Sequence, residues 1–341
     1  MRILIIQPSS LGDVAQALPV VADIRAGHPA AVVDWVVEPA FAPLVRRVAG
    51  IGEVIEGALG RWRERWWAGA TRSEWRAFKQ RLRREAYDAV IDLQGSAASA
   101  LAARAARGRS YGVANPQGRA AARWLVDLSI ALPPRLHALD RARQSVARVL
   151  GGAVQGGPEF GLRREPPPAG ERPVIVFAHG SAHPERLWAD ARWLVLGRRF
   201  VEAGWTIALP HGNELEQVRA EQLAAAIDSE VTAFLDTGLG AGAAVQVWPR
   251  LRLDMLLERL GAAHGVVGVD SGLARVAVAL GLPVVQVYLQ PNAWYSGPQR
   301  AHGRRHQLPI GGDAVPTVDE VWATWRRALA AADARDRDEA T

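Results

Sequence analysis

The chain has 341 residues, of which 49% are hydrophobic, and it carries a formal net charge of +6. This length and composition suffice for two domains with hydrophobic cores. The absence of cysteine excludes disulfides, thiolate catalysis and cysteine-bound metals, and no run of about 18 apolar residues predicts a transmembrane helix. The first residues lack the apolar region of a secretory signal peptide, so we expect a cytoplasmic protein.

The basic residues number 41, and only Lys79 among them is a lysine. A surplus of arginine favours anionic partners such as phosphates, nucleic acid or an acidic membrane surface. Nucleic acid ranks lowest, because the sequence shows no helix-turn-helix, zinc-finger or RNA-binding signature and its arginines are spread over the chain. We therefore expect a phosphate-bearing or membrane-borne partner and no nucleic acid.

The chain opens with a short apolar run, Ile3–Ile6, which predicts a buried parallel strand. A turn of small residues follows at 8–12, and an amphipathic helix is predicted from about Asp13 to Ala26. Ligands of open α/β sheets bind at such strand-to-helix corners, where backbone N–H groups face a crevice. Position alone allows two roles for Asp13: a helix N-cap, which is the more ordinary one, or a general base.

Strands and helices alternate through the rest of the first half. Strands are predicted at 32–37, 52–56, 87–92 and 110–113, and helices at 38–47, 73–86 and 96–106. Between the strands predicted at 52–56 and 87–92, the segment Arg61–Trp67 interleaves basic and aromatic residues. The alternation indicates a doubly wound domain.

A second α/β pattern begins after a stretch rich in Gly and Pro, 151–173, which is typical of a linker. Strands are predicted at 173–177, 205–209, 265–269 and 283–288, and helices from Glu214 and over Val318–Ala331, with a charged and frayed tail. The turn at 179–182 and the corner at 270–275 repeat the arrangement of the N-terminus. The sequence thus predicts the α/β class, with two Rossmann-like doubly wound domains facing each other across a cleft.

Two common nucleotide-binding motifs are missing from the sequence. Neither first strand is followed by Gly-x-Gly-x-x-Gly, and there is no P-loop; the glycines of Gly238–Gly242 are misplaced for both motifs, and we interpret this segment as a loop. The sole Asp-x-Asp pair, Asp336 and Asp338, lies in the charged tail. These features argue against a dehydrogenase, an ATPase and a metal site.

Six short motifs occur in order: Ser9–Val14, Asp34–Glu38, Arg61–Arg63, Tyr87–Gly95, His137–Arg141 and Val269–Leu273. Each is weak alone, but the set and its spacing resemble the bacterial lipopolysaccharide heptosyltransferases, specifically the heptosyltransferase I group. These are inverting glycosyltransferases of the two-Rossmann-domain type, the GT-B fold. The resemblance covers nearly the whole chain. It implies an acceptor-binding domain at 1–155, a linker and hinge at 156–173, a nucleotide-sugar-binding domain at 174–315, and a C-terminal helix and tail at 316–341 that return to the first domain.

The resemblance also implies the substrates and the base. The donor would be ADP-L-glycero-D-manno-heptose and the acceptor a Kdo residue of Kdo2-lipid A, in the synthesis of the lipopolysaccharide inner core, without cofactor or metal. Asp13 would be the general base that removes the acceptor hydroxyl proton, which favours catalysis over capping. Ser10 and Gly12 of the same motif would contact the acceptor.

Donor binding is implied for one set of residues in the second half: Ser181, Arg186, Glu216, Asp270, Ser271, Gly272 and Leu273. Arg186 stands where the family more often has lysine and would neutralise the diphosphate. Glu216 would contact the ribose, or is an ordinary first-turn residue of a helix. Asp270 would hold the heptose, or is an N-cap. Arg275 replaces a histidine that is common in the family, which alters one contact to the donor.

Acceptor binding is implied for four arginines: Arg61, Arg63, Arg119 and Arg141. Any one of them could be an ordinary surface residue, but arginine suits carboxylates and phosphates because it binds them bidentately. We expect Trp62 to pack against its own domain. Trp66 and Trp67 are expected to meet the membrane, with packing as the alternative. The protein would thus be peripheral on the cytoplasmic face of the inner membrane.

Other functions remain open at this point. One is heptosyltransferase II, or a related sugar transferase with another donor or acceptor; the Arg61–Arg63 and Asp92–Gly95 segments favour heptosyltransferase I. Another is a nucleotide-sugar-binding protein that has lost its activity, against which Asp13 argues. A nucleotide-sugar epimerase would need a second acid/base pair, which we do not find.

Overall fold

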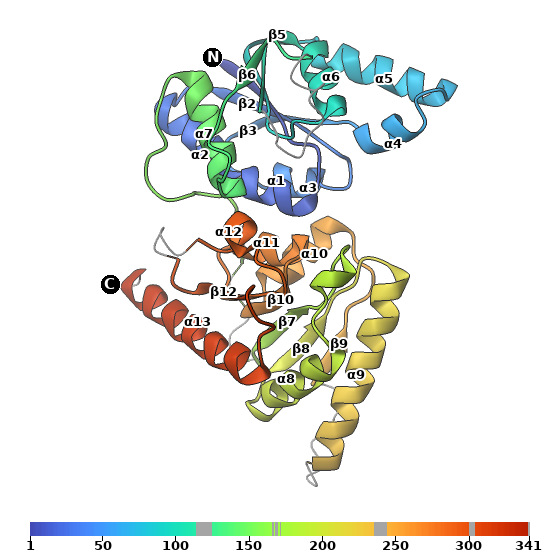
Figure 1. Cartoon of the computed structure of the whole chain (residues 1–341), viewed down its shortest axis with the longest axis vertical. Coiled ribbons are helices and arrows are strands. Elements are labelled where there is room, and N and C mark those ends of the chain that lie inside the picture. The colour runs from blue at the N-terminus through green and yellow to red at the C-terminus, as the bar shows by residue number, and fades with distance from the viewer. Residues whose placement is uncertain are drawn as a thin grey trace. The chain divides into compact units, whose positions relative to one another are not determined.

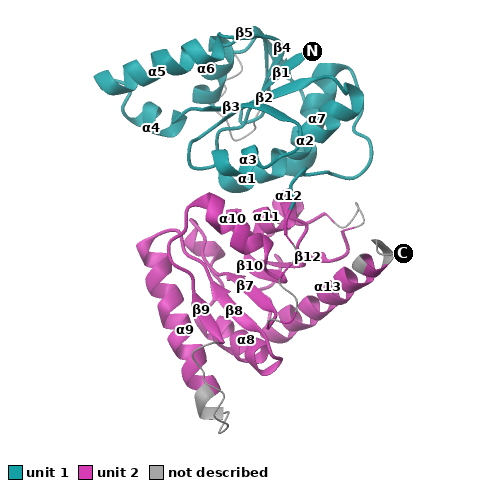
Figure 2. Cartoon of the chain, turned by 180° about the vertical axis from the view of Figure 1, so that it is seen from behind, with its two compact units in different colours: residues 1–163 teal, residues 164–341 magenta. Residues whose placement is uncertain are grey.

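The computed structural model describes residues 1–113, 125–165, 167, 170, 172–234, 244–299 and 304–339, and Figure 1 shows the course of the chain. It divides into two compact units, residues 1–163 and 164–341 (Figure 2). Arg119 and the Gly238–Gly242 segment lie outside the described residues. In the part of the chain that is described, no helix is long and apolar enough to span a membrane.

Unit 1 is built on a parallel sheet of strand order β3-β2-β1-β4-β5-β6. Its strands are β1 (Arg2–Ile6), β2 (Val32–Val37), β3 (Ile51–Glu56), β4 (Ala86–Asp92), β5 (Arg107–Val113) and β6 (Leu128–Ile130). Ile3–Ile6 of β1 are fully buried, as expected for a strand between β2 and β4 that is covered on both faces. The helices are α1 (Leu11–Ala17), α2 (Pro19–Gly27), α3 (Ala42–Arg46), α4 (Leu59–Glu64), α5 (Gly69–Leu82), α6 (Ala97–Ala105) and α7 (Ala138–Leu150).

The first predicted helix is wrong in two respects. It begins at Leu11 with Ser10 as the N-cap, so Asp13 occupies the third helical position. It is also two helices, because Pro19 has no N–H for a continuous helix and instead begins α2. The helix predicted at 38–47 is shorter than expected and covers only Ala42–Arg46.

Unit 2 repeats this architecture with the strand order β12-β11-β10-β7-β8-β9. Its strands are β7 (Val174–Ala178), β8 (Thr206–Leu209), β9 (Val245–Val247), β10 (Gly265–Val269), β11 (Val284–Tyr288) and β12 (Gln307–Gly311). Its helical segments are the 3-10 turn η2 (Pro184–Arg186) and the α-helices α8 (Asp190–Glu202), α9 (Glu214–Phe234), α10 (Leu253–Gly261), α11 (Gly272–Ala279), α12 (Ala293–Ser296) and α13 (Val318–Glu339). Two doubly wound parallel sheets confirm the predicted α/β class.

The last helix, α13, packs on the sheet and on α8 of unit 2. Trp325 lies in the core with Phe200 and Trp205, and it approaches β10 so closely that a Cβ on Gly265 would lie 2.3 Å from its ring. The helix continues to Glu339, beyond the predicted end at Ala331 and through the tail expected to be frayed. The return of this segment to the first domain stays a prediction.

The start of the predicted linker is attached to unit 1. Arg143, whose side chain is only 1% exposed, donates to the carbonyl oxygens of Gln155 and Gly156 while it pairs with Asp23 at 2.7 Å. The N–H of Ala49 donates to the carbonyl of Gly161. The division between the units accordingly lies between Arg163 and Arg164.

Candidate active site

The residues expected to act gather at equivalent places in the two units. In each sheet the first three strands lie side by side in chain order, and the next three lie on the other side of the first strand. The direction in which strands are added therefore reverses between β1 and β4 in unit 1 and between β7 and β10 in unit 2. Ligands of doubly wound sheets bind at the carboxyl ends of the strands at this reversal. In unit 1 these ends lead to Ser10–Asp13 and Asp92–Gly95, and in unit 2 to His179–Ser181 and Asp270–Ser271.

Asp13 lies half-buried in the first turn of α1. Its carboxylate accepts hydrogen bonds from the backbone N–H of Ser10 at 3.3 Å and from the Ser10 hydroxyl at 3.0 Å, as in a capping box. Asp13 is thus not the N-cap, but it does support the capping residue. A general base and a helix-stabilising contact are compatible here, because a carboxylate oxygen has more than one lone pair.

Two glutamines tie the loop before Asp13 to the neighbouring strand end. The amide nitrogen of Gln7 donates to the carbonyl of Ser9 at 2.9 Å and to the side-chain oxygen of Gln94 at 2.8 Å. The N–H of Ser9 approaches the same Gln94 oxygen at 3.4 Å. The turn after β4 thereby fixes the position of the segment that carries Ser10 and Asp13.

Asp92 holds that turn from inside the sheet. Its carboxylate is 1% exposed and accepts from the N–H groups of Gln94 and Gly95 and from the Ser99 hydroxyl, at 3.0 to 3.1 Å. Gly95 adopts a positive φ of 65°, which favours glycine at this turn. Burial raises the pKa of Asp92 to about 7, although the three hydrogen bonds oppose the shift.

We expect Asp92→Asn to flatten the pH dependence of stability. An unfolded aspartate has a pKa near 4, so the folded chain binds the Asp92 proton more tightly than the unfolded chain does. The stability that this gives is complete below about pH 4 and is lost as the pH rises through about 7. Asparagine does not ionise. Urea unfolding of both proteins from about pH 5 to about pH 8 should show a loss, on the order of a few kcal/mol, in the parent alone; parallel curves would contradict it.

The arginines expected at the acceptor are only partly brought together. Arg61 and Arg63 share α4, and Arg61 pairs with Glu74 at 2.5 Å. Arg141 lies on α7, which packs on α1 and α2. Arg119 is not described. The four residues are not shown as one cluster, and their role in binding stays a prediction.

The tryptophans of this region differ in exposure, and contact of Trp66 and Trp67 with a membrane stays a prediction. Trp62 is 8% exposed, packs edge-on against Trp75 and Phe78, and donates its indole N–H to Glu74 at 2.6 Å. This confirms that Trp62 packs within its unit. Trp66 and Trp67 are 69% and 63% exposed.

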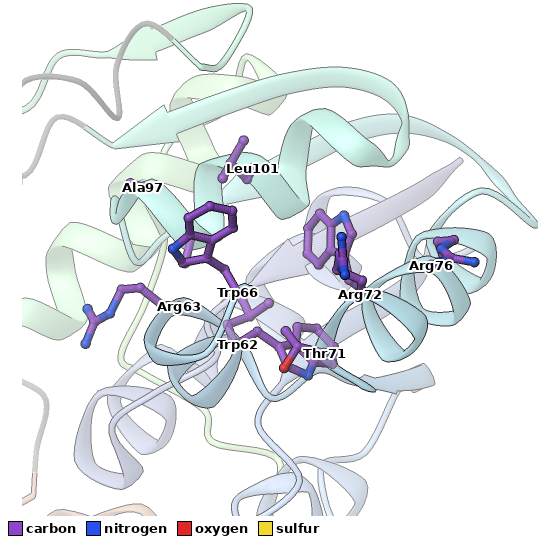
Figure 3. Close-up of a pocket in the computed structure, with 11 residues that line it drawn as sticks. Trp62, Arg63, Trp66, Thr71, Arg72, Arg76, Ala97 and Leu101 are labelled. Carbon is purple, nitrogen blue, oxygen red and sulfur yellow. The ribbon is translucent and has the colours of Figure 1, made fainter. Parts of the chain in front are cut away.

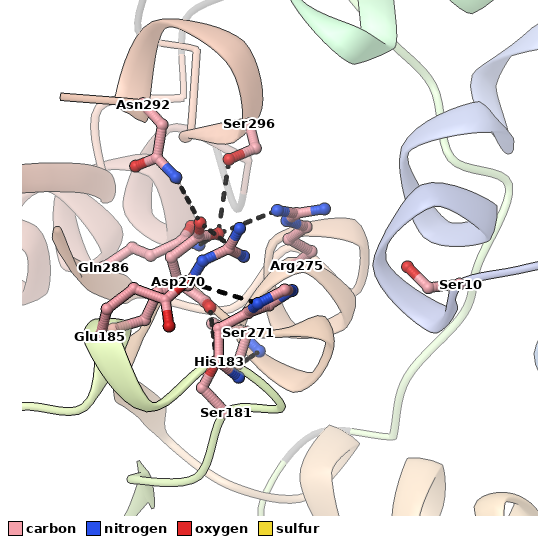
Figure 4. A network of polar contacts seen from close by, with 12 residues as sticks. Ser10, Ser181, His183, Glu185, Asp270, Ser271, Arg275, Gln286, Asn292 and Ser296 are labelled. Carbon is pink, nitrogen blue, oxygen red and sulfur yellow. Dashed lines mark hydrogen bonds and ion pairs between the residues drawn. The ribbon is translucent and has the colours of Figure 1, made fainter. Parts of the chain in front are cut away.

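In unit 2, Asp270 is the centre of a network of polar contacts (Figure 4). The carboxylate is 2% exposed and meets two arginines, Arg186 at 3.1 Å and Arg275 at 2.9 Å. Asn292 donates to it at 2.9 Å, and more distant contacts of 3.4 Å come from Gln286 and Ser296. One buried carboxylate therefore orients two cations that come from different segments.

The N-terminus of α11 begins directly after this carboxylate. Ser271, not Asp270, is the N-cap, because its hydroxyl accepts from the N–H of Ala274 at 3.3 Å. Gly272 and Leu273 form the first turn, whose N–H groups have no acceptor within the helix and attract anions. The Ser181 hydroxyl lies 3.5 Å from the carbonyl oxygen of Asp270. The structure thus brings most of the expected donor residues to one place.

Glu216 has an evident structural role. It occupies the first turn of α9, where its carboxylate accepts the N–H of Gly212 at 2.7 Å and its own N–H donates to Asn213. The carboxylate also lies over Gly180, where a Cβ would come within 2.7 Å of it. These contacts fit the ordinary first-turn interpretation and hold Glu216 beside the turn after β7; binding of ribose stays a prediction.

Several members of the Asp270 network were not found from the sequence. Gln286 left a signal, because a polar residue inside the apolar run Val284–Tyr288 needs a buried partner. Asn292 and Ser296 left none, since α12 has only four residues and no periodicity to interpret. In unit 1, Asp92 belongs to the Tyr87–Gly95 motif and Gln7 follows the predicted strand Ile3–Ile6, but the contacts of both depend on how β1 and β4 pair.

Comparisons with known proteins agree on one family. The model of glycosyltransferase family 9 (heptosyltransferase) matches residues 75–302. Lipopolysaccharide heptosyltransferase 1 of Pseudomonas aeruginosa is 33% identical over 318 residues, which cover 92% of this chain and 84% of that protein. The solved structure of E. coli heptosyltransferase WaaC with ADP is 28% identical, with a TM-score of 0.81 and coverage of 96% of this chain and 100% of that one.

A second structure of WaaC, with ADP-2-deoxy-2-fluoro heptose, is also 28% identical, covers both chains completely and has a TM-score of 0.72. These matches confirm the resemblance found in the six motifs. The family model spans more than half of the chain and the Pseudomonas protein aligns with most of it. The chain therefore belongs to glycosyltransferase family 9, the heptosyltransferase family, and is a glycosyltransferase.

Proposed function

We propose that this chain transfers L-glycero-D-manno-heptose from ADP-heptose to a Kdo residue of Kdo2-lipid A, in lipopolysaccharide inner-core synthesis. The observation that carries the proposal is the cluster of Arg186, Asp270 and Arg275 after β10, next to the N-terminus of α11. The two guanidinium groups outnumber the one Asp270 carboxylate, so together with the first N–H groups of the helix they leave net positive charge where a diphosphate would bind. The family relative bound to a fluorinated ADP-heptose supports the same donor.

The reaction is a displacement at the anomeric carbon of the heptose. Asp13 takes the proton of the acceptor hydroxyl as that oxygen forms a bond to the anomeric carbon. The bond from this carbon to the diphosphate oxygen breaks on the opposite face, and its electron pair leaves with ADP. Arg186 and the N–H groups of Gly272 and Leu273 stabilise the charge that develops on the departing diphosphate. The configuration at the anomeric carbon is inverted.

This scheme assigns the leaving-group charge to arginine and backbone dipoles, and we propose that no metal or other cofactor takes part. In the described part of the chain, no group of three or more His, Asp or Glu side chains is arranged to hold a metal ion. Because arginine and backbone N–H groups take the leaving-group charge in this scheme, transfer should persist in the presence of EDTA. A loss of activity that Mg²⁺ restores would contradict the proposal.

The direct test is ADP release by the purified chain given ADP-heptose, with and without Kdo2-lipid A. We expect release that depends on the acceptor. Release that requires an acceptor already bearing one heptose would instead indicate heptosyltransferase II. If the chain binds ADP-heptose but releases no ADP with Kdo2-lipid A or with the acceptor that already bears one heptose, it has lost its activity. If it neither binds ADP-heptose nor releases ADP, its donor is a different one.

Arg186→Ala should weaken ADP binding by roughly 10- to 100-fold, because a hydrogen bond from a charged donor is worth about 1.5–3 kcal/mol. Arg186→Lys should restore part of the affinity, since it keeps the charge and loses the planar fork. Isothermal titration with ADP measures both effects. Arg198→Ala removes an arginine that pairs with Glu202 and Glu230 and is the matched control. Equal losses in Arg186→Ala and Arg198→Ala would mean that Arg186 contributes only to the net charge.

We also propose that the protein works at the cytoplasmic face of the inner membrane, since its acceptor is a lipid. The exposed Trp66 and Trp67 support this proposal, as do the exposed basic residues of the following helix, including Arg72 and Arg76. In a flotation assay, the protein should rise with anionic vesicles at low salt and dissociate from them at high salt. Flotation that does not depend on lipid charge would contradict an electrostatic attachment.

A further inference from the structure

Unit 1 contains an apolar cavity that the proposed reaction does not use. We call it the tryptophan pocket; it has a volume of about 570 Å³ and is lined by Leu59, Trp62, Arg63, Trp66, Thr71, Arg72, Trp75, Arg76, Ala97, Ala98 and Leu101. It lies among α4, the first half of α5 and the start of α6. Figure 3 shows Trp62, Trp66 and Leu101 between Arg63 on one side and Arg72 and Arg76 on the other.

The floor of the tryptophan pocket is closely packed. Leu59, Trp62 and Thr71 are buried, and the ring of Trp62 is held by Trp75, Phe78 and the hydrogen bond to Glu74. The packed floor needs no rearrangement to receive a ligand, which lowers the cost of binding. Its outer wall is exposed: Leu101 is 46% accessible, and Trp66 is more so.

The lining favours a hydrocarbon chain over a neutral sugar. The hydroxyl groups of a sugar need acceptors as well as donors, and Thr71 is the only lining side chain with an acceptor oxygen, while the Trp62 N–H is already used by Glu74. Arg63, Arg72 and Arg76 add three positive charges to an otherwise apolar lining. An apolar cavity with cations at its edge suits an amphiphile whose anionic head stays outside while its tail is buried.

We propose that the tryptophan pocket binds one acyl chain of the lipid acceptor, drawn out of the bilayer, while Arg72 and Arg76 meet an anionic group of its head. The proposal rests on the proposed function, because that function supplies an acylated, anionic acceptor. Of the two expected acceptor residues on α4, Arg63 lines the cavity, and Arg61 lies on the same helix and pairs with Glu74. Chain burial in the pocket would thus hold the acceptor close to the residues expected to bind its sugar.

The test fills the pocket and compares two acceptors. Ala98→Phe places a ring in the cavity, whereas Ala77→Phe places the same ring on an exposed position of α5 outside the lining. With acylated acceptor, Ala98→Phe should raise KM about tenfold, which corresponds to excluding roughly two methylene groups from burial. With fully deacylated acceptor, neither variant should change KM or kcat.

A second readout does not depend on transfer. A monomeric anionic phospholipid with brominated acyl chains should quench tryptophan fluorescence in the parent and in Ala77→Phe, and much less in Ala98→Phe. Quenching with this pattern but no turnover would overturn the proposed function and leave the pocket as a chain-binding site. The assignment of the pocket to an acyl chain would be overturned if the KM of the parent were equal for the acylated and the deacylated acceptor. It would also be overturned if the quenching persisted in Ala98→Phe. Quenching seen only with intact vesicles would mean that Trp66 and Trp67 insert into the bilayer and no chain enters.

Discussion

Asp13→Asn is expected to lower kcat by about 10²–10⁴-fold while the chain stays folded and still binds ADP. The substitution keeps the size of the side chain and one carbonyl oxygen that can accept from the N–H of Ser10. It removes the capacity to take a proton at neutral pH. Because ADP-heptose binding is assigned to residues of unit 2, the affinity for ADP should change little. The measurement is acceptor-dependent ADP release, beside ADP titration of the same preparation.

A loss of activity must be separated from a loss of the helix cap. Asp13 supports Ser10 at the start of α1, and removal of such a cap costs about 0.5–2 kcal/mol of stability. Unit 2 contains a matched pair at the start of α13, where the Glu320 carboxylate accepts from the N–H of Thr317 at 2.8 Å and from its hydroxyl at 2.9 Å. Glu320→Gln therefore makes the same carboxylate-to-amide change in the same kind of cap, at a position outside the proposed chemistry.

The two variants should be similarly destabilised in urea but differ widely in turnover. If Asp13→Asn keeps activity within about tenfold of the parent while Glu320→Gln does the same, Asp13 is a capping residue and the base must be sought elsewhere. If both lose activity together, the assay reports stability. Only a selective loss in Asp13→Asn supports proton removal by this carboxylate.

The central strands could be predicted because burial on both faces leaves a continuous apolar run. Ile3–Ile6 and Gly265–Val269 are such runs, and they became β1 and β10. The edge strands β6, β9 and β12 could not be predicted. Leu128–Ile130 and Val245–Val247 have three residues each, and Gln307–Gly311 contains a proline. Such segments become strands because a neighbour is already in place, which is information that a local pattern lacks.

The site could be predicted where it follows directly on a strand and not where it depends on distant segments. Asp13 and Asp270 each stand just after an apolar strand, so the strand-to-helix corner indicates them. The partners of Asp270 come from four separate parts of the chain: Arg186 from η2, Arg275 from α11, Gln286 from β11, and Asn292 with Ser296 from the region of α12. Only the strand order brings these parts together at the carboxyl ends of β7, β10 and β11.

Because several segments of unit 2 meet at the buried Asp270 carboxylate, its removal should have a large effect on stability. Asp270→Ala should lower the free energy of unfolding by about 3–5 kcal/mol, the range for breaking a buried ion pair by removal of one partner. The carboxylate is almost fully buried, and so is Arg275, with 10% of its side chain exposed. Alanine removes the acceptor that both guanidinium groups share. Urea unfolding of the full chain measures the loss through the tryptophan-rich core of unit 2.

Asp23→Ala is the matched control, because it removes the carboxylate partner of Arg143, which is also buried, but in unit 1. It too should destabilise the chain, yet by less, since Arg143 keeps the carbonyl oxygens of Gln155 and Gly156 as acceptors. The two variants should differ in donor binding. At temperatures where both are folded, Asp270→Ala should bind ADP-heptose poorly, because Arg186 is no longer oriented, and Asp23→Ala should bind it normally. Normal donor binding by a folded Asp270→Ala variant would mean that the network serves stability alone, and that Arg186 finds the diphosphate without it.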